Sequence, residues 1–329
     1  MMSNHLPITE FDVIFISYDE PNADANYADL LDKCPWAKRS HGVWGSDAAH
    51  KAAAAMSDTE RFITIDADNI VHDDFFNVVL DMDKVGDNHV ISWAGKNMVN
   101  GLVYGNGGIK CWPVHVVNGM RTHEAAPESD KAAQVDFCWN IHYVQMNNIY
   151  CDVHNNGSAY QAYRAGFREG CKMSLEGGDV VDKYALKNVH KRNYQRMLVW
   201  MSVGEDAPHG LWAVYGSRLG CYKTNIDRTG WDWRDVRDFN WHTKYFTEVV
   251  QPQFADPEGD SICSATGYKY NSAKLKEETV RLGRILQDEL DLEIADMDSK
   301  ASRFFKEVYV NPSRLGAQVR EEQVDDSLE

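Results

Sequence analysis

Two apolar, β-prone segments that each end in acidic residues constrain the fold most strongly. Residues 11–17, FDVIFIS, continue into Tyr-Asp-Glu, and residues 61–65, RFITI, continue into Asp66-Ala67-Asp68. Between them lies the alanine-rich segment 46–57, SDAAHKAAAAMS, for which we expect a helix with a serine N-cap. Apolar runs that are separated by helices are typical of buried strands in a parallel sheet. The sequence therefore predicts an α/β fold with acidic groups at the carboxyl ends of two strands.

The rest of the chain changes from strand patterns to helix patterns. Residues 89–117 contain β-rich runs around Gly-Asn-Gly-Gly, which predicts strands that are broken by a tight turn at 105–108. Helical apolar spacing covers 158–173 and 181–200, and 272–308 reads as one or two amphipathic helices. We therefore expect an α/β core over 1–150, a mostly helical lobe over 151–315 and a disordered acidic tail over 316–329.

Composition limits the class of protein. The 329 residues are 43% hydrophobic and 26% charged, which is ordinary for a soluble globular protein. No run of about 18 apolar residues and no basic-then-apolar N-terminus is present, so we expect no membrane partner and a cytoplasmic location. The seven cysteines form no Cys-x-x-Cys pair, which favours reduced thiols over disulfides or structural zinc.

The net charge of −16 restricts nucleic-acid binding to a local basic patch, because most of the surface would repel a polyanion. Residues 183–196 form the one candidate patch and contain no acid; its basic side chains are Lys183, Lys187, Lys191, Arg192 and Arg196. A solvated helix face is the alternative interpretation.

The Asp66-Ala67-Asp68 motif has a chemical reason. Ligands bind beyond the carboxyl ends of strands in open α/β sheets. Two carboxylates at i and i+2 can hold one hard cation, and Mg²⁺ and Mn²⁺ favour such oxygen ligands. The alternative is that the aspartates are only the polar end of a buried strand, since this short pattern is common in acidic proteins. We expect Asn69 to be a turn residue.

These features, in this order over roughly the first 140 residues, resemble the DxD glycosyltransferases of the GT-A (Rossmann-like nucleotide-diphospho-sugar transferase) fold. The segments that carry the resemblance are FISYDEPNADAN, the Lys-Arg pair before the alanine-rich helix, FITIDADN and GNGGIK. The resemblance implies a metal-dependent transfer of a sugar from a nucleoside diphosphate, such as a UDP-sugar, to a hydroxyl group, with Mn²⁺ or Mg²⁺ as cofactor. Asp68 would be the direct metal ligand, and Asp66 would contact the metal or the donor ribose. The donor-binding residues would be Ser17, Tyr18, Asp19, Lys38, Arg39, Asp66 and Ala67.

The same resemblance implies an acceptor side. Gly107, Gly108 and Lys110 would border the acceptor pocket, although the glycines could also serve only a tight hairpin. Asp136 would be the catalytic base if the enzyme inverts the anomeric centre, and would orient the acceptor if it retains configuration. His209 would be a tentative third metal ligand, with an ordinary surface histidine as the alternative.

A narrower resemblance is to bacteriophage glycosyltransferases that modify hydroxymethylated DNA bases. It is carried by FISYDEPNADANYADLL, PWAKRSHGV, NGSAYQAYRAGFREG and GLWAVYGSRLG. It implies 5-hydroxymethylcytosine in phage DNA as acceptor, in the cytoplasm of a bacterial host. Lys191 and Arg192 would contact phosphates, and Trp231 would stack on a flipped base. Arg164 and Arg168 share one helix face, which an ion pair with Glu169 would equally explain.

Three alternatives stay open at this point. The acceptor could be a saccharide, or the chain could be a non-catalytic nucleotide- or carbohydrate-binding protein with a GT-A shell, since its ten tryptophans suit sugar stacking. A nucleotidyltransferase would also use paired aspartates, but such enzymes usually open with a Gly-rich basic phosphate loop, which SYDEPNADAN is not.

Overall fold

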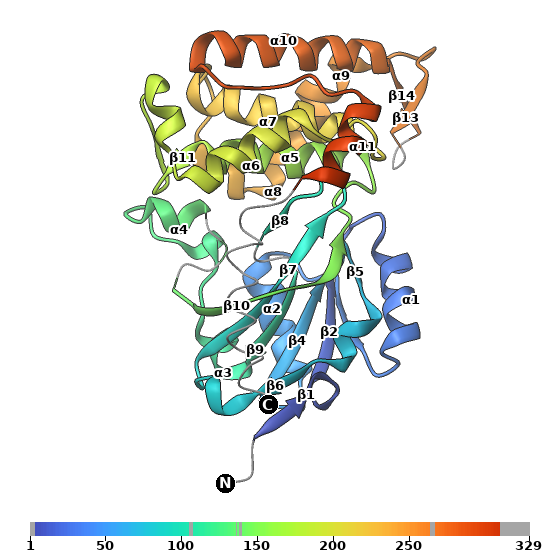
Figure 1. The fold of residues 1–329 in the computed structure, drawn as a ribbon, viewed down its shortest axis with the longest axis vertical. Helices are drawn as coiled ribbons and strands as arrows, with labels where there is room; N and C mark the ends of the chain where they lie inside the picture. The colour runs from blue at the N-terminus through green and yellow to red at the C-terminus, as the bar shows by residue number, and fades with distance from the viewer. Residues whose placement is uncertain (1–3, 105–107, 136, 138–139, 264–266, 310–329) are drawn as a thin grey trace.

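The structure is a computed structural model that describes residues 4–104, 108–135, 137, 140–263 and 267–309. It contains a curved mixed sheet and a helical lobe that lies across one end of this sheet (Figure 1). The α/β class is therefore confirmed. The last strand of the sheet ends at Val153 and the helical lobe begins at Ala159.

The main sheet has eight strands. In spatial order they are β3 (Lys38–His41), β2 (Asp12–Ser17), β4 (Arg61–Asp66), β9 (Ile109–Pro113), β7 (His89–Asn97), β10 (His142–Val153) and β5 (Asn69–Val71), with β8 (Val103–Tyr104) paired to β7. β2 is parallel to β3 and β4, whereas β9 is antiparallel to β4 and β7. Parallel pairing puts Ile16 beside Asp66, so the acidic ends of β2 and β4 lie together.

Both faces of the central strands are buried, which explains their continuous apolar sequences. Val13 and Phe15 pack in one cluster with Leu30 of α1 (Ala23–Lys33). Ile14 points to the other face and packs with Ala53 of α2 (Ser46–Ala55). The two helices therefore cover opposite faces of the sheet.

The N-terminus of α2 is capped differently from the sequence prediction. Ser46 is the first helical residue rather than the N-cap, and Gly45 at the N-cap has a φ of 90°. The backbone N–H groups of Ser46 and Asp47 donate to the Glu124 carboxylate at 2.8 and 3.2 Å. A carboxylate from a distant segment thus stabilises the helix N-terminus.

Two other predicted elements need correction. Residues 114–117, expected in a strand region, belong to the helix α3 (Val114–Gly119). The single helix expected over 181–200 is a 3₁₀ helix (Lys183–Asn188) followed by α6 (Lys191–Ser202). Residues 272–308, expected to form one or two helices, form two, since α10 spans Ser272–Leu290 and α11 spans Ser299–Val308.

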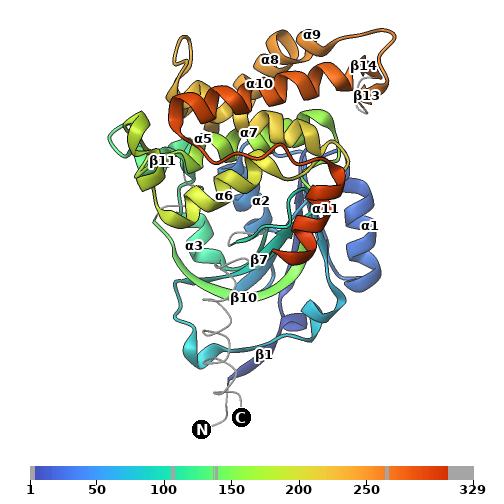
Figure 2. The same ribbon diagram turned by 45° about the horizontal axis from the view of Figure 1, so that its top comes forward.

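The remaining elements complete both parts. Three small antiparallel pairs are formed by β1 (His5–Pro7) with β6 (Val79–Asp81), β11 (Leu175–Glu176) with β12 (Asp179–Val180), and β13 (Ser261–Cys263) with β14 (Tyr268–Tyr270). The other helices are α4 (Lys131–Val135), α5 (Ala159–Met173), α7 (Gly210–Asn225), α8 (Phe239–Tyr245), a π-helical turn (Phe246–Val250) and α9 (Gln251–Phe254). α10 lies on the side of α7 away from the sheet (Figure 2).

Helices α5 and α7 pack backbone against backbone. A Cβ atom at Gly166 would lie 1.9 Å from the carbonyl oxygen of Ala213, and one at Gly170 would lie 2.0 Å from that of Ser217. Only glycine permits this approach. The crossing is therefore fixed by residues that the sequence shows at i and i+4.

Arg218 of α7 joins four segments of the helical lobe. Its side chain is 1% exposed. Its guanidinium donates to the carbonyl oxygens of Met201, Thr279 and Ala295 at 2.8, 2.7 and 3.2 Å, and to Asp296 Oδ1 at 2.7 Å. A buried cation is stable here because almost every N–H group it carries has an acceptor.

Two predictions about the whole chain can be compared with the described residues. No helix in the described part is long and apolar enough to cross a membrane. The six cysteines in the described part of the chain are buried and form no disulfide there, and Cys138 lies outside the described residues. The predicted tail 316–329 also lies outside them.

Candidate functional site

Two cavities meet at the carboxyl end of the sheet, beneath the helical lobe. Their volumes are about 660 and about 360 Å³. Asp66 and Asp68 line both cavities, so the carboxylate pair lies at their junction. The other shared lining residues are His50, Phe137, Asn155, Arg168 and Glu169.

The smaller cavity brings together most of the predicted donor-binding residues. Ser17 ends β2, and Tyr18 and Asp19 follow it. These three residues line the cavity together with Asp66, Ala67 and Asp68. Tyr18 is 39% exposed, and its ring meets that of Trp44 edge to face, with centroids 5.3 Å apart. Two partly exposed rings beside acidic groups can hold a planar aromatic base.

The two basic residues predicted for donor binding do not line this cavity. Lys38 Nζ lies 3.1 Å from Asp12 and 2.8 Å from Asp58, near the start of β2. Its ammonium group is therefore at the opposite end of the strands, and the predicted donor contact is wrong. Arg39 Nε donates to the Ser17 hydroxyl at 2.8 Å, so Arg39 positions a lining residue rather than lining the cavity itself.

Asn69 contacts the Asp66-Ala67-Asp68 segment through its side-chain amide. Its Nδ2 donates to Asp68 Oδ1 and to the Asp66 carbonyl oxygen, both at 3.2 Å. The sequence prediction gave it only a turn role, but Asn69 begins β5, is 2% exposed and lines the larger cavity. Its position directly after the motif was the available signal.

The carboxylates repel one another in this setting. Burial raises the pKa of Asp68 to about 7, with further contributions from the charges of Asp66 and Glu20 and an opposing one from Arg164. Within the described part of the chain, neither Asp66 nor Asp68 forms an ion pair with a basic side chain. A nearby cation would relieve this repulsion and lower the pKa of Asp68.

The donor set fits Mn²⁺ or Mg²⁺. No group of three or more His, Cys, Asp or Glu side chains is placed to hold a metal among the residues described. Two carboxylates leave the other positions of an octahedral ion to water and phosphate oxygens, as Mg²⁺ sites usually do. His209 is not brought to the pair: it precedes α7 with a φ of 53° and lines neither cavity.

Two predicted acceptor-side residues line the larger cavity. Gly108 has a φ of +95° and lies against Asn69 and Asp66. Lys110 is 4% exposed, and its Nζ lies 5.9 Å from the centroid of the Phe137 ring. No carboxylate in the described residues lies within ion-pair distance of Lys110. Its ammonium group is therefore available to an anionic or polar ligand.

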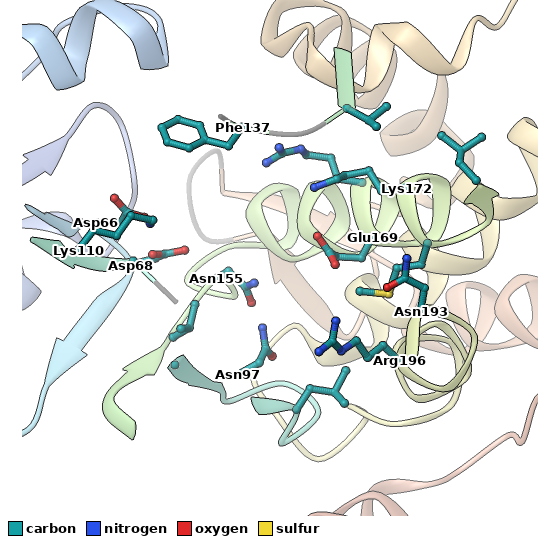
Figure 3. A pocket seen from close by; sticks show the side chains of 18 of the residues that line it. Asp66, Asp68, Asn97, Lys110, Phe137, Asn155, Glu169, Lys172, Asn193 and Arg196 are labelled. Atoms are coloured by element: carbon teal, nitrogen blue, oxygen red, sulfur yellow. The ribbon is translucent and has the colours of Figure 1, made fainter. Parts of the chain in front are cut away.

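The opposite wall of the larger cavity is mainly basic. Figure 3 shows Asp66, Asp68 and Lys110 on the sheet side, and Lys172, Glu169 and Arg196 across the cavity on the helices. Arg168 also lines this wall. Sequence reasoning placed Arg196 in the basic patch but missed Lys172, which lies one turn after Arg168 on α5.

Lys187, Lys191 and Arg192 of the predicted basic patch do not line the cavity. Lys191 and Arg192 are exposed at the start of α6 and line neither cavity. Lys187 forms an ion pair with Asp291, and Lys183 lies in the preceding 3₁₀ helix.

Trp231 is part of the core of the helical lobe. It is 8% exposed, and its ring centroid lies 4.4 Å from that of Trp241 and 5.2 Å from that of Phe167. Trp231 packs against these rings and lines neither of the two cavities, so the structure does not bring it to the carboxylate pair, where stacking on a flipped base was predicted. The catalytic residue predicted at Asp136, and Gly107, lie outside the described residues.

Comparisons with protein-family models, with curated proteins and with solved structures found no match for this chain.

Proposed function

We propose that this chain is a metal-dependent glycosyltransferase of the GT-A fold that uses a nucleoside-diphosphate sugar, with a UDP-sugar as the first donor to test. The observation that carries the proposal is the position of Asp66 and Asp68, which line both cavities. A transferase needs one site for the donor, one for the acceptor and a shared boundary where the bond is exchanged.

The smaller cavity suits the nucleotide. Tyr18 and Trp44 offer aromatic surfaces for the base, and Asp19 offers an acceptor for its N–H groups. Asp66 and Asp68 would hold Mn²⁺ or Mg²⁺ at the diphosphate. When bound, the cation offsets the negative charge that develops on the departing diphosphate.

The larger cavity suits the acceptor. Lys110 lies on its sheet side, close to the carboxylates, and would orient the acceptor through its ammonium group. The transferred carbon exchanges its bond to the diphosphate oxygen for a bond to the acceptor oxygen, and the acceptor proton leaves to a base. Asp136 stays a prediction for that base.

The function is tested by measuring nucleotide release from UDP-sugars with Mn²⁺, with Mg²⁺ and with EDTA. We expect activity with a divalent ion and none in EDTA. Asp68→Asn should lower kcat/KM on the order of 100-fold or more, because it removes a carboxylate that would hold the cation. Without that cation, the negative charge on the departing diphosphate is not offset. Asp74→Asn is the control, since Asp74 is exposed and lines neither cavity. Turnover that is unchanged both in EDTA and in Asp68→Asn, relative to wild-type protein with a divalent ion, would refute the metal role. Nucleotide binding without sugar release would favour a binding protein.

We propose 5-hydroxymethylcytosine in DNA as the acceptor to test first. Arg168, Lys172 and Arg196 give the acceptor cavity a positive wall that suits a phosphate-bearing substrate, while Lys191 and Arg192 lie nearby on α6. Duplexes that contain cytosine or hydroxymethylcytosine should be incubated with sugar donors and analysed by mass spectrometry. A mass gain in the hydroxymethylated duplex alone supports this acceptor, whereas transfer only to free saccharides rejects it.

A further inference from the structure

His50 lies at the junction of the two cavities and has no role in the proposed binding of the metal, the nucleotide or the acceptor. It belongs to α2, is 5% exposed and lines both cavities. Its Nδ1 lies 2.8 Å from the carbonyl oxygen of Ser46. Because a carbonyl oxygen can only accept, Nδ1 carries the ring proton. The Nε2 atom of His50 therefore has a lone pair and can only accept a hydrogen bond.

No group in the described residues donates to this Nε2. The ring is held between aromatic neighbours, with centroids 4.9 Å from Phe137 and 5.7 Å from Trp112. Burial lowers the pKa of His50, so the ring stays neutral and Nε2 stays an acceptor. A buried acceptor without a partner is unfavourable until a ligand supplies a donor.

Two amides beside His50 have the same deficit. The side-chain oxygen of Asn69 has no partner in the described chain, and its Nδ2 is already engaged by Asp66 and Asp68. The side-chain oxygen of Asn155, which lines both cavities, also lacks a partner there. The junction thus presents several acceptors, and a ligand that matches them must bring several donors. A sugar, with a hydroxyl group on most of its carbons, has this chemistry.

We propose that His50 Nε2 accepts a hydrogen bond from a hydroxyl group of the sugar that the nucleotide donor carries. This inference rests on the proposed function. The donor sugar is favoured over the acceptor because His50 lies beside the carboxylates that would mark the end of the diphosphate, and the sugar is the next group of the donor. His50 is a binding residue in this scheme and takes no proton.

Binding of UDP and of UDP-glucose in the presence of Mn²⁺, measured by titration calorimetry, tests the assignment. His50→Phe keeps a ring but removes the acceptor, and should weaken UDP-glucose binding about ten-fold while leaving UDP binding unchanged. His50→Gln, whose amide oxygen can accept, should recover part of the loss.

The matched control is His123→Phe. His123 is 2% exposed and its ring centroid lies 6.1 Å from that of Phe137, but it lines neither cavity. We expect both nucleotides to bind this variant as they bind the wild-type protein.

A spectroscopic readout separates the contact from a structural effect. With ¹⁵N-labelled histidine, the Nε2 resonance of His50 should move upfield on addition of UDP-glucose, the direction for a nitrogen that accepts a hydrogen bond, and should not do so with UDP. Equal losses for UDP and UDP-glucose in His50→Phe, or unchanged affinity for both, would overturn the inference while leaving the proposed function intact. Wild-type protein that binds neither nucleotide would overturn both.

Discussion

Replacing Gly108 with alanine should damage the carboxylate pair more than the fold. A Cβ atom at Gly108 would lie 2.0 Å from Asn69 Nδ2 and 3.1 Å from Asp66 Oδ2. Asn69 would have to move, and its two hydrogen bonds to the DxD segment would be lost. The φ of +95° adds about 1–2 kcal/mol for a residue with a Cβ, and the lost bonds add about 1 kcal/mol each, giving a total of about 3–4 kcal/mol.

Gly230→Ala isolates the backbone contribution. Gly230 has a φ of +64° and no atom within 4 Å of an added Cβ. The substitution should therefore lower the free energy of unfolding by only about 1–2 kcal/mol. The difference of about 2 kcal/mol should then place the melting temperature of Gly108→Ala roughly 3 °C below that of Gly230→Ala. Titration with Mn²⁺ and UDP should show at least about a ten-fold weaker complex for Gly108→Ala alone, because the displaced amide no longer orients Asp68. Equal melting temperatures and wild-type Mn²⁺ and UDP binding in Gly108→Ala would refute this reasoning.

Two further predictions concern stability. Arg218→Met leaves three buried carbonyl oxygens without their donor and should lower the free energy of unfolding by about 3–5 kcal/mol in urea titrations. Asp296→Asn, at a side chain that is 44% exposed, should lower it by about 1 kcal/mol or less, and similar losses in the two variants would contradict the role given to the guanidinium. Burial, assisted by nearby arginines, lowers the pKa of both His123 and His242 from 6.5 to about 3. Between pH 6.5 and pH 3 the unfolded chain therefore binds more protons than the folded protein. The free energy of unfolding should fall as the pH falls below 6.5, by about 1.4 kcal/mol per pH unit for each histidine. Urea midpoints at pH 7.5 and 5.5 should show this loss, and a folded double variant His123→Phe, His242→Phe with the same loss would contradict the assignment.

The sequence predicted the elements whose signal is local. The two-faced burial of β2 and β4 follows from their continuous apolar residues, and the meeting of Tyr18 and Asp66 follows from parallel pairing. The acidic strand ends were therefore sufficient to indicate the position of the junction.

The features that were missed depend on long-range contacts. Glu124 caps a helix that begins 78 residues earlier. Lys38 forms ion pairs with Asp12 and Asp58 and does not line the cavity. A tryptophan in an arginine-rich segment has the same composition whether its faces are exposed or covered, so the burial of Trp231 could not be predicted. The single histidine of the alanine-rich helix was a usable signal, since His50 and Lys51 are the two polar residues within 48–55.

Under the proposed function, the glycine crossing of α5 and α7 bears on how the acceptor could change. Arg168, Glu169 and Lys172 line the large cavity from α5, while Gly166 and Gly170 fix the same helix against α7. A shift of α5 would break this contact along its length, so the wall cannot be reshaped by moving the helix. Divergence toward a new acceptor would instead proceed by exchange of individual side chains on a stationary wall. Libraries built for altered acceptor choice should vary those positions and keep the glycines.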